Sequence, residues 1–204
     1  MSRFTGPRVK VMRAMGLDLP GLSRKSIERR PFPPGVHGGT RRRKESVHGM
    51  QLKEKQKLRY NYGVSERQMR RYVLEARRSK DETGSKLLEL LERRLDNVVF
   101  RAGYAPTIPA ARQLINHGHF RLNGRKANVA SIRVKSGDVI APRERSMKVA
   151  VITESMEGLR IARPDWASVE ANKLETTITS LPDPNSVPFE VDVQLVVEYY
   201  AKRL

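Results

Sequence analysis

Residues 94–138 change their periodicity several times within a short stretch of chain. Helical spacing of apolar residues gives way to a loop, to a second helix at about 108–117, and then to short strands around the Asn123-Gly124 turn. Lysine or arginine recurs on the polar side of these elements. The pattern predicts a small α+β module with a positively charged outer surface, which suits the phosphate backbone of a nucleic acid.

Helical spacing also predicts which polar residues of this segment share a face. Arg94, Asn97 and Arg101 are separated by three and four positions on the first helix, so they should project from one side. Arg112 and Asn116 should project together from the second helix, away from its apolar stripe. We expect both groups to meet phosphates.

The charge of the whole chain supports a polyanionic partner. The sequence has 40 Lys and Arg against 22 Asp and Glu, which gives a net charge of +18 and a pI of about 10.7. Residues 1–60 hold 16 basic and 4 acidic side chains (+12), and residues 94–155 hold 11 and 4 (+7). Residues 61–93 are near neutral at +2, and residues 156–204 are mildly acidic at −3. We predict nucleic-acid contact for the two basic blocks and a scaffold or protein-facing role for the others.

Several classes of protein are excluded by composition. The sequence has no cysteine, which rules out disulfides, thiolate metal sites and cysteine nucleophiles. No apolar run reaches the roughly 20 residues of a membrane span. We expect a soluble protein that acts where it is made, in the cytoplasm, or in the stroma if it is encoded in a plastid genome.

The first 48 residues show no sustained periodicity, because glycines and prolines interrupt all but two short helical pieces at about 9–15 and 23–30. Residues 41–44 are all basic. Such a segment buries little apolar surface, so we expect it to become ordered only on its anionic partner. A basic tail without defined structure even when bound is the alternative.

The rest of the chain has stronger helix signals. Helices are expected at 49–60, at 66–78 with a capping box of Ser65 and Gln68, and at about 86–101. Short strands are expected at 132–134, 139–140 and 174–178, a short helix at 147–155, and a last helix capped by Asp192. The last helix should pack back onto the helices before residue 94.

Several stretches, taken in order along the chain, resemble the fourth protein of the bacterial small ribosomal subunit, the S-four family. They are Gly6-Pro7-Arg8, Pro34-Gly35-Val36-His37-Gly38, EKQKLRYNYG at 54–63, ERRLDN at 92–97, ARQL at 111–114, HGH at 117–119, and residues 134–138 and 195–202. The resemblance covers essentially the whole length and is closest to cysteine-free cyanobacterial and plastid members.

The resemblance implies an α+β fold: a helical domain made of discontinuous segments, an inserted small α+β RNA-binding module of two helices packed on a short β-sheet, and an extended basic N-terminal segment. The expected boundaries are 1–44 for the basic extension, 45–93 plus 173–204 for the mainly helical domain, and 94–172 for the module with its C-terminal extension.

The function that this family implies is that of a structural constituent of the small ribosomal subunit. Such a protein is a primary binder of 16S ribosomal RNA, nucleates assembly of the subunit body, and contributes to translational accuracy through its neighbours, the third, fifth and twelfth proteins. No cofactor is implied. Some members hold zinc with cysteines that this chain lacks, so we expect no metal.

The charge pattern and the resemblance together predict a set of RNA-binding residues. They are Arg3, Arg8, Lys10, Arg13, Arg41, Arg42, Arg43, Lys44, Lys55, Lys57, Arg59, Tyr60, Arg67, Arg70, Arg71, Arg94, Asn97, Arg101, Arg112, Asn116, His117, His119, Arg121, Arg125, Lys126, Arg133 and Lys135. The expected mode is recognition of shape and phosphates rather than of bases.

Two other functions remain open at this point. Pseudouridine synthases carry a similar module and use an aspartate in an Arg-Leu-Asp context, which this chain has at Arg94-Leu95-Asp96. No separate catalytic domain accompanies it, so we interpret Asp96 as structural, holding a backbone group or an arginine, and we expect no enzyme. A stand-alone RNA chaperone would not need the N-terminal block or the last helix.

His117 and His119 lack a carboxylate or thiol at ligand spacing, so we expect them to bond backbone or RNA rather than a metal.

Overall fold

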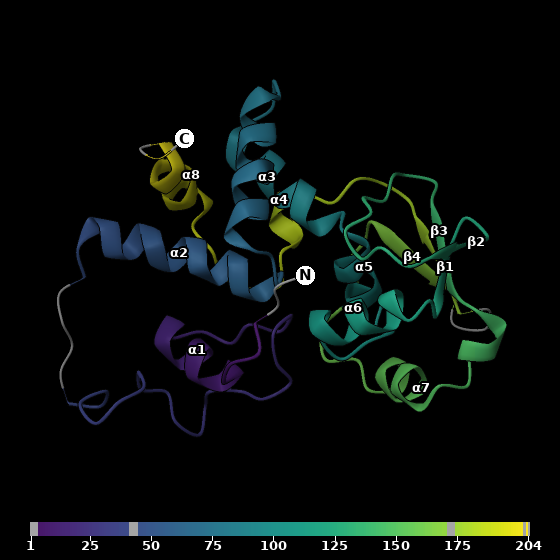
Figure 1. Ribbon diagram of the computed structural model, residues 1–204, viewed down its shortest axis with the longest axis horizontal. Helices are drawn as coiled ribbons and strands as arrows, with labels where there is room; N and C mark the ends of the chain where they lie inside the picture. Colours follow the sequence, from purple (N-terminus) through teal and green to yellow (C-terminus); the bar gives the residue numbers. More distant parts are fainter. Residues whose placement is uncertain (1–3, 41–44, 171–173, 202, 204) are drawn as a thin grey trace. The chain divides into compact units, whose positions relative to one another are not determined.

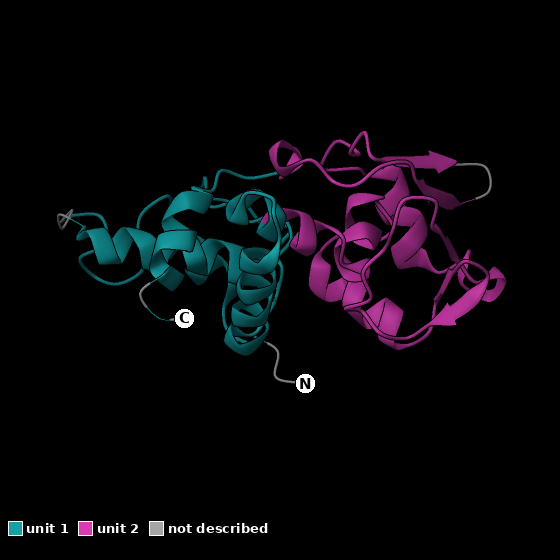
Figure 2. Ribbon diagram, turned by 90° about the horizontal axis from the view of Figure 1, so that it is seen from above, with its two compact units in different colours: residues 1–87, 188–204 teal, residues 88–187 magenta. Residues whose placement is uncertain are grey.

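The computed structural model describes residues 4–40, 45–170, 174–201 and 203 (Figure 1). The chain divides into two compact units, which Figure 2 colours separately. Unit 1 contains residues 1–87 and 188–204, and unit 2 contains residues 88–187. The sequence predicts 94–172 for the inserted module, whereas unit 2 spans residues 88–187. The basic extension expected at 1–44 falls within unit 1.

Unit 1 is built from helices. They are α1 (Arg8–Met15), α2 (Val47–Asn61), α3 (Glu66–Arg78), α4 (Thr83–Glu92), within which the boundary falls, and α8 (Val193–Ala201). The capping box that begins α3 is formed as predicted, with Ser65 accepting from the Gln68 N–H and the Gln68 side chain accepting from the Ser65 N–H. Asp192 caps α8 by accepting from the Leu195 N–H at 3.2 Å.

α8 packs along α2, although residues 62–192 lie between them in sequence (Figure 1). The Tyr200 hydroxyl donates to Glu66 Oε1 at 2.7 Å, and Lys55 Nζ donates to Glu66 Oε2 at 2.9 Å. Gln51 on α2 donates to Glu198 on α8 at 3.0 Å. These buried or half-buried polar contacts fix the register in which the last helix returns to the first unit.

The N-terminal segment has more structure than its glycines and prolines suggest. The helix expected at 9–15 is present as α1, and Met12, Leu19 and Leu22 form a small buried core against Tyr60 and Phe189. The expectation that this segment buries little apolar surface is therefore wrong for this part, whereas its ordering on an anionic partner stays a prediction. The second expected helix, at 23–30, is absent and its residues form turns and bends.

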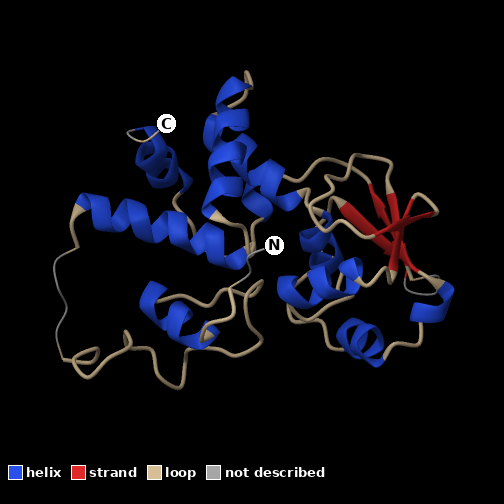
Figure 3. Cartoon of the chain, in the orientation of Figure 1, coloured by secondary structure: helices blue, strands red, loops and turns tan. Residues whose placement is uncertain are grey.

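Unit 2 holds all the strands among the described residues, as Figure 3 shows. Its helices are α5 (Leu95–Arg101), α6 (Ile108–Asn116) and α7 (Ala150–Glu157), with two short 3-10 helices at Glu144–Ser146 and Pro184–Ser186. The strands are β1 (Phe120–Leu122), β2 (Arg125–Ala127), β3 (Val139–Pro142), β4 (Ala167–Glu170) and β5 (Glu175–Ile178). They form one antiparallel sheet in the order β2-β1-β3-β5-β4. The predicted α+β fold class is confirmed.

α5 packs against α6, and the core continues from the helices to the sheet. The ring of Tyr104, in the loop between them, lies 5.6 Å from the ring of Phe120 on β1. The Tyr104 hydroxyl donates to the Leu174 carbonyl at 2.8 Å and accepts from Thr176 at 2.9 Å. Burial raises the pKa of Tyr104 to about 12, so this hydroxyl stays protonated and keeps its bond to the sheet.

The helix expected at about 86–101 is broken at Arg94, which has extended backbone angles and precedes α5. The break follows from contacts with residues 130–134, which run beside residues 93–96. Leu95 N–H donates to the Ile132 carbonyl at 2.8 Å, and Val134 N–H donates to the Arg93 carbonyl at 2.9 Å. Residues 132–134 therefore make one isolated bridge, Arg94 with Arg133, and the strand expected there is wrong.

We predict that Leu114→Ala destabilises unit 2 by about 2–5 kcal/mol, because Leu114 is buried on α6 and its loss leaves a cavity. Urea unfolding followed by the fluorescence of Trp166, a buried residue of the same unit, measures the change. Gln113→Ala is the matched control, since Gln113 is exposed on the same helix and should change stability by about 0.5 kcal/mol or less. Equal unfolding midpoints for the two variants would contradict the prediction.

We predict a pH-dependent contribution of Glu66 to the stability of unit 1. Burial alone would raise the pKa of Glu66, but hydrogen bonds from Tyr200 and Lys55 outweigh burial and hold the pKa below its usual value of 4.5. A group with a lowered pKa stabilises the fold above its unfolded pKa, and this contribution is lost as the pH falls through the folded pKa.

The cost of Glu66→Gln should therefore be largest above pH 4.5 and should shrink below it. Urea unfolding at a series of pH values, followed by far-UV circular dichroism, measures this cost. Glu190→Gln, at an exposed carboxylate of the same unit, is the control. A cost that does not vary with pH would contradict the assignment.

Candidate nucleic-acid interface

The carboxylate of Asp96 is fully buried near the start of α5 and binds two arginines. Arg94 donates from Nε to Oδ1 at 3.0 Å and from Nη2 to Oδ2 at 2.8 Å. Arg112 on α6 donates from Nε and Nη2 to Oδ2 at 3.0 and 2.6 Å. The Asn97 N–H also donates to Oδ1 at 3.0 Å. Asp96 thus joins α5 to α6 through the guanidinium of Arg112 and holds Arg94, which precedes α5, at the same point.

A second buried acid, Glu92, lies close to two further residues of the predicted set, Asn97 and Arg101. Asn97 Nδ2 donates to the carbonyl and to Oε2 of Glu92, both at 3.0 Å. Arg101 Nε lies 3.6 Å from Glu92 Oε2, and Arg101 Nη2 donates to the Ser186 carbonyl at 2.6 Å. Glu92, Asn97 and Arg101 are all buried.

The expectation that Arg94, Asn97 and Arg101 face a phosphate backbone is therefore wrong. Asn97 and Arg101 lie on α5, whereas Arg94 precedes this helix with an extended backbone, so the shared helical face predicted for all three is not formed. All three are buried because Asp96 and Glu92 supply buried partners. Arg112 is also mostly covered by its pairing with Asp96. Asp96 binds two arginines and a backbone N–H, which are the contacts that its interpretation as a structural residue expects.

Two lysines of α2 from the predicted set also bind acids of unit 1. Lys55 is buried, so it does not present its charge to solvent as expected, because Glu66 holds it at 2.9 Å and the Tyr199 ring lies 4.8 Å from its Nζ. Lys57 Nζ lies 2.6 Å from Glu54 Oε1 and is largely covered.

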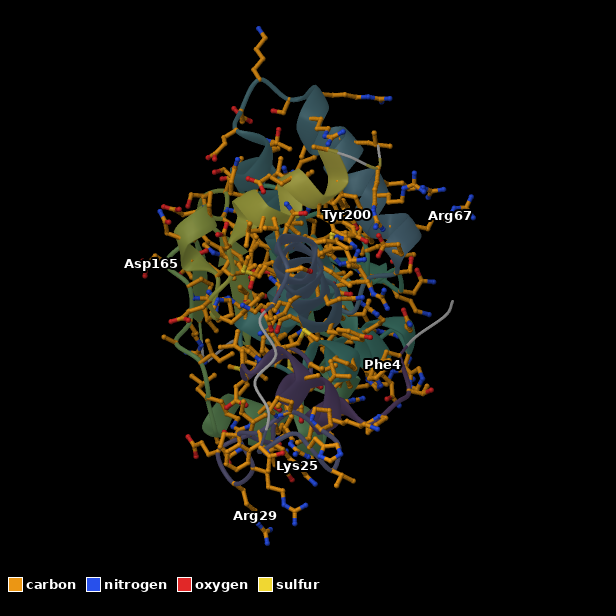
Figure 4. The ribbon with its side chains drawn as sticks, turned by 90° about the vertical axis from the view of Figure 1, so that its left-hand side faces the viewer. Phe4, Lys25, Arg29, Arg67, Asp165 and Tyr200 are labelled. Carbon is orange, nitrogen blue, oxygen red and sulfur yellow. The ribbon has the colours of Figure 1, made fainter. Side chains whose placement is uncertain are left out.

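The half-buried residues at the end of α2 form an aromatic and cationic cluster. The guanidinium of Arg59 lies 5.1 Å from the ring of Tyr60, and the edge of Phe4 approaches that ring with a centroid distance of 5.1 Å. Arg59 also lies 3.7 Å from Glu66. Figure 4 labels Phe4 on this part of unit 1.

Arginines of α1 hold the loops that follow it. Arg8 Nη1 donates to the Leu22 carbonyl at 3.3 Å. Arg13 donates from Nε to the Phe32 carbonyl at 2.9 Å and from Nη2 to the Pro33 carbonyl at 3.3 Å. Lys10 is exposed. Arg13 thus lies at the surface while its guanidinium group is hydrogen-bonded to the backbone of the loop at 32–33.

α3 presents the most regular exposed charge of unit 1. Met69, Val73 and Ala76 bury one side of this helix. The other side carries a group of exposed arginines that we call the α3 arginine stripe, which consists of Arg67, Arg70, Arg71 and Arg78. Figure 4 shows Arg67 reaching outward from the helix. Their spacing places them along about 17 Å of helix, a length suited to a run of phosphates.

In unit 2, four basic residues lie at or near the tip of the β1–β2 hairpin, which we call the hairpin end: Arg121, Arg125, Lys126 and Lys135. This tip is rigid, because Asn123 Nδ2 donates to Asp138 Oδ1 and the Val139 N–H donates to Asn123 Oδ1, both at 2.8 Å. Asp138 also accepts from the Lys135 N–H at 2.7 Å. The hairpin and the following turn therefore hold these charges on one fixed backbone.

The remaining predicted residues of unit 2 follow α6. Asn116 and His117 are exposed, whereas His119 is half-buried with Nδ1 3.0 Å from Ser146 Oγ. The methylene groups of Lys126 cover Gly118, where an added Cβ would lie 2.6 Å from Lys126 Cε. Arg133 is half-buried beside Arg94. The exposed members of this group extend the charge of the hairpin end toward the C-terminus of α6.

Five predicted residues, Arg3 and the run 41–44, lie outside the described residues. The structure adds others that the prediction omitted: Lys25, Arg29 and Arg30 are exposed, and Figure 4 shows Lys25 and Arg29 reaching away from unit 1. The sequence signal for these residues is the cluster of basic side chains at 24–30. The prediction assigned this stretch to a helix at 23–30 and did not include its basic side chains in the RNA-binding set.

Among the described residues, no three His, Cys, Asp or Glu side chains come together in a way that could hold a metal ion. None of the helices that the structure describes has the length and apolar character needed to cross a membrane. These surfaces carry guanidinium, ammonium and imidazole groups, so they can bind anions through charge and hydrogen bonds.

Comparison with known proteins assigns the chain to a class. The family described as "Ribosomal protein S4/S9 N-terminal domain" matches residues 3–92, and the family described as "S4 domain" matches residues 93–140. The two matches meet at the start of the Arg94-Asp96 cluster and define a ribosomal protein.

The relatives make the assignment particular. Proteins named "Small ribosomal subunit protein uS4" from Methylobacillus flagellatus and Synechococcus elongatus are 58% and 49% identical to this chain over 205 residues, and "Small ribosomal subunit protein uS4B" from Nitrosomonas europaea is 55% identical. Each alignment covers 100% of both chains. The chain belongs to the uS4 family of small ribosomal subunit proteins. The resemblance to the S-four family and the expectation of a protein that is not an enzyme are thereby confirmed.

We predict that Asp96→Ala destabilises unit 2 by about 3–5 kcal/mol, because it leaves the buried Arg94 and the mostly covered Arg112 without their carboxylate. Glu144→Gln is the matched control: Glu144 also pairs with an arginine, Arg121 at 3.5 Å, but both are exposed, so its loss should cost about 1 kcal/mol or less. Urea unfolding followed at Trp166 compares the two. The structural role of Asp96 is refuted if Asp96→Ala unfolds at the same urea concentration as the control.

Proposed function

We propose that this chain is a structural protein of the small ribosomal subunit that binds 16S ribosomal RNA directly and early. The observation that carries the proposal is full-length identity of 49–58% to proteins named as small ribosomal subunit protein uS4. The charge of +18 supports it, because a chain with that excess needs a polyanion as its partner. The protein then works within the ribosome.

The geometry supports binding through phosphates at two surfaces. In unit 1 the α3 arginine stripe supplies guanidinium groups on a rigid helix, and in unit 2 the hairpin end supplies a second group on a locked turn. Arginine suits phosphate because its fork can donate two parallel hydrogen bonds. Folded RNA hides its base edges in a deep, narrow groove, so these surfaces recognise the shape and backbone of the RNA.

A protein that holds RNA at two sites can also organise its folding. We therefore include in the proposal that the chain nucleates assembly of the subunit body. We also include contacts with the third, fifth and twelfth proteins of the subunit, through which it contributes to translational accuracy. The mildly acidic residues 156–204 provide the surface of lower charge that protein neighbours need.

We predict that binding to 16S ribosomal RNA falls steeply with salt, with each phosphate contact adding roughly 0.7–0.9 to the log–log slope. Replacing Arg67, Arg70 and Arg71 together by glutamine should lower the slope by about 2 and weaken binding without changing the unfolding transition, because all three are exposed. Filter binding at a series of salt concentrations measures both quantities.

The matched control replaces the same three arginines by lysine. It keeps the charges but not the fork, so the salt slope should remain while the affinity falls only modestly. A flat slope for the wild-type protein would overturn the proposed RNA binding. An unchanged slope and affinity in the glutamine variant would remove the α3 arginine stripe from the interface.

A further inference from the structure

Phe32 is an aromatic side chain that the phosphate-binding surfaces do not explain. It is 55% exposed, in the loop of residues 31–40 that follows the exposed Arg29 and Arg30. A single exposed apolar side chain is ordinary on a protein surface. What distinguishes Phe32 is that its backbone is held in place and its surroundings are cationic.

The backbone on both sides of Phe32 is fixed. Arg13 donates to the Phe32 carbonyl at 2.9 Å and to the Pro33 carbonyl at 3.3 Å, which ties the loop to α1. The neighbouring residues at 31, 33 and 34 are prolines, which restrict the backbone further. The ring therefore has a defined position before any partner arrives.

The loop also folds back beneath the ring. The Gly38 N–H donates to the Gly35 carbonyl at 3.3 Å, and Gly35 has a positive φ of 111°. A Cβ on Gly38 would lie 1.9 Å from the Pro33 carbonyl oxygen, so only glycine permits this close approach. A Cβ on Gly39 would lie 3.9 Å from the Phe32 ring. The turn supports one side of the ring and leaves more than half of the side chain open to solvent.

The surroundings favour a nucleobase as the occupant of the open side. Residues 1–60 have a net charge of +12, so an anionic partner is favoured over a protein surface. A base offers a flat π-face to an aromatic ring, and its own phosphates supply the negative charge. A base is accessible in this way only where it is unpaired.

We infer that Phe32 stacks on an unpaired base of the bound RNA while Arg29 and Arg30 contact the flanking phosphates. This inference rests on the proposed function and deepens it. The α3 arginine stripe and the hairpin end bind the backbone of folded RNA, whereas Phe32 requires a nucleotide that is out of its helix. The loop at 31–40 thereby makes binding sensitive to whether the RNA has that unpaired position.

The test compares Phe32→Leu with the wild-type protein on 16S ribosomal RNA and on a fully paired RNA duplex. Leucine is apolar and of similar bulk but has no π-face, so affinity for the ribosomal RNA should fall by roughly 5- to 100-fold. The log–log salt slope should not change, because no phosphate contact is lost. Affinity for the duplex should be the same for both proteins.

Two further variants separate stacking from other causes. Phe32→Trp should retain the affinity, and the added indole fluorescence should be quenched when the ribosomal RNA binds. Val36→Ala is the matched control, because Val36 is 93% exposed in the same loop and should bind like the wild type.

The outcomes distinguish this inference from the function on which it rests. If the wild type binds with a steep salt slope and Phe32→Leu binds equally well, the stacking site is overturned while the proposed function stands. A lowered log–log salt slope in Phe32→Leu also overturns it. That result would mean that the substitution removed phosphate contacts made by the loop rather than a stacking contact made by the ring. If the wild type does not bind ribosomal RNA, both fall.

Discussion

The buried carboxylate of Asp96 is the contact on which unit 2 depends. Two guanidinium groups and a backbone N–H meet it, and both Asp96 and Arg94 are shielded from water. Removing one member of such a cluster leaves the others uncompensated in a medium of low polarity. The break at Arg94 belongs to the same arrangement, since residues 130–134 occupy the backbone groups that a continuous helix would have used. The result is a rigid frame on which the hairpin end is displayed.

Arginine has two roles in this protein, and neighbouring acids decide which one a given residue takes. Arg94 and Arg101 meet Asp96 and Glu92 and become part of the interior. Arg67 and Arg70 lie on the outer side of an amphipathic helix whose apolar side is buried, so they remain available to a phosphate. The proposed interface therefore depends on where acidic residues are absent as much as on where basic residues are present.

The sequence was most informative where structure is local. The Ser65–Gln68 capping box, the Asp192 cap and the Asn123-Gly124 turn each depend on residues within a few positions, and each is present. Contacts between distant segments were not foreseeable in this way. Spacing predicts one continuous helix through Arg94 and Arg101 but shows neither the break at Arg94 nor the acids that bury both residues. Lys55 is covered only because Glu66 and Tyr199 come to it from other helices. The sequence did not predict the edge strand β4 for the same reason. Its four residues form a strand because they pair with β5, and a segment that short carries no clear strand pattern of its own.

The return of α8 to α2 sets an order for events on the synthesising ribosome. The Tyr200–Glu66 bond joins residues 134 positions apart, with all of residues 88–187 between them. Because synthesis runs from the N-terminus, every residue of unit 2 is made before α8, and the surface of α2 that α8 covers stays open to water until α8 follows. The last helix to be made is therefore the one that closes the first unit.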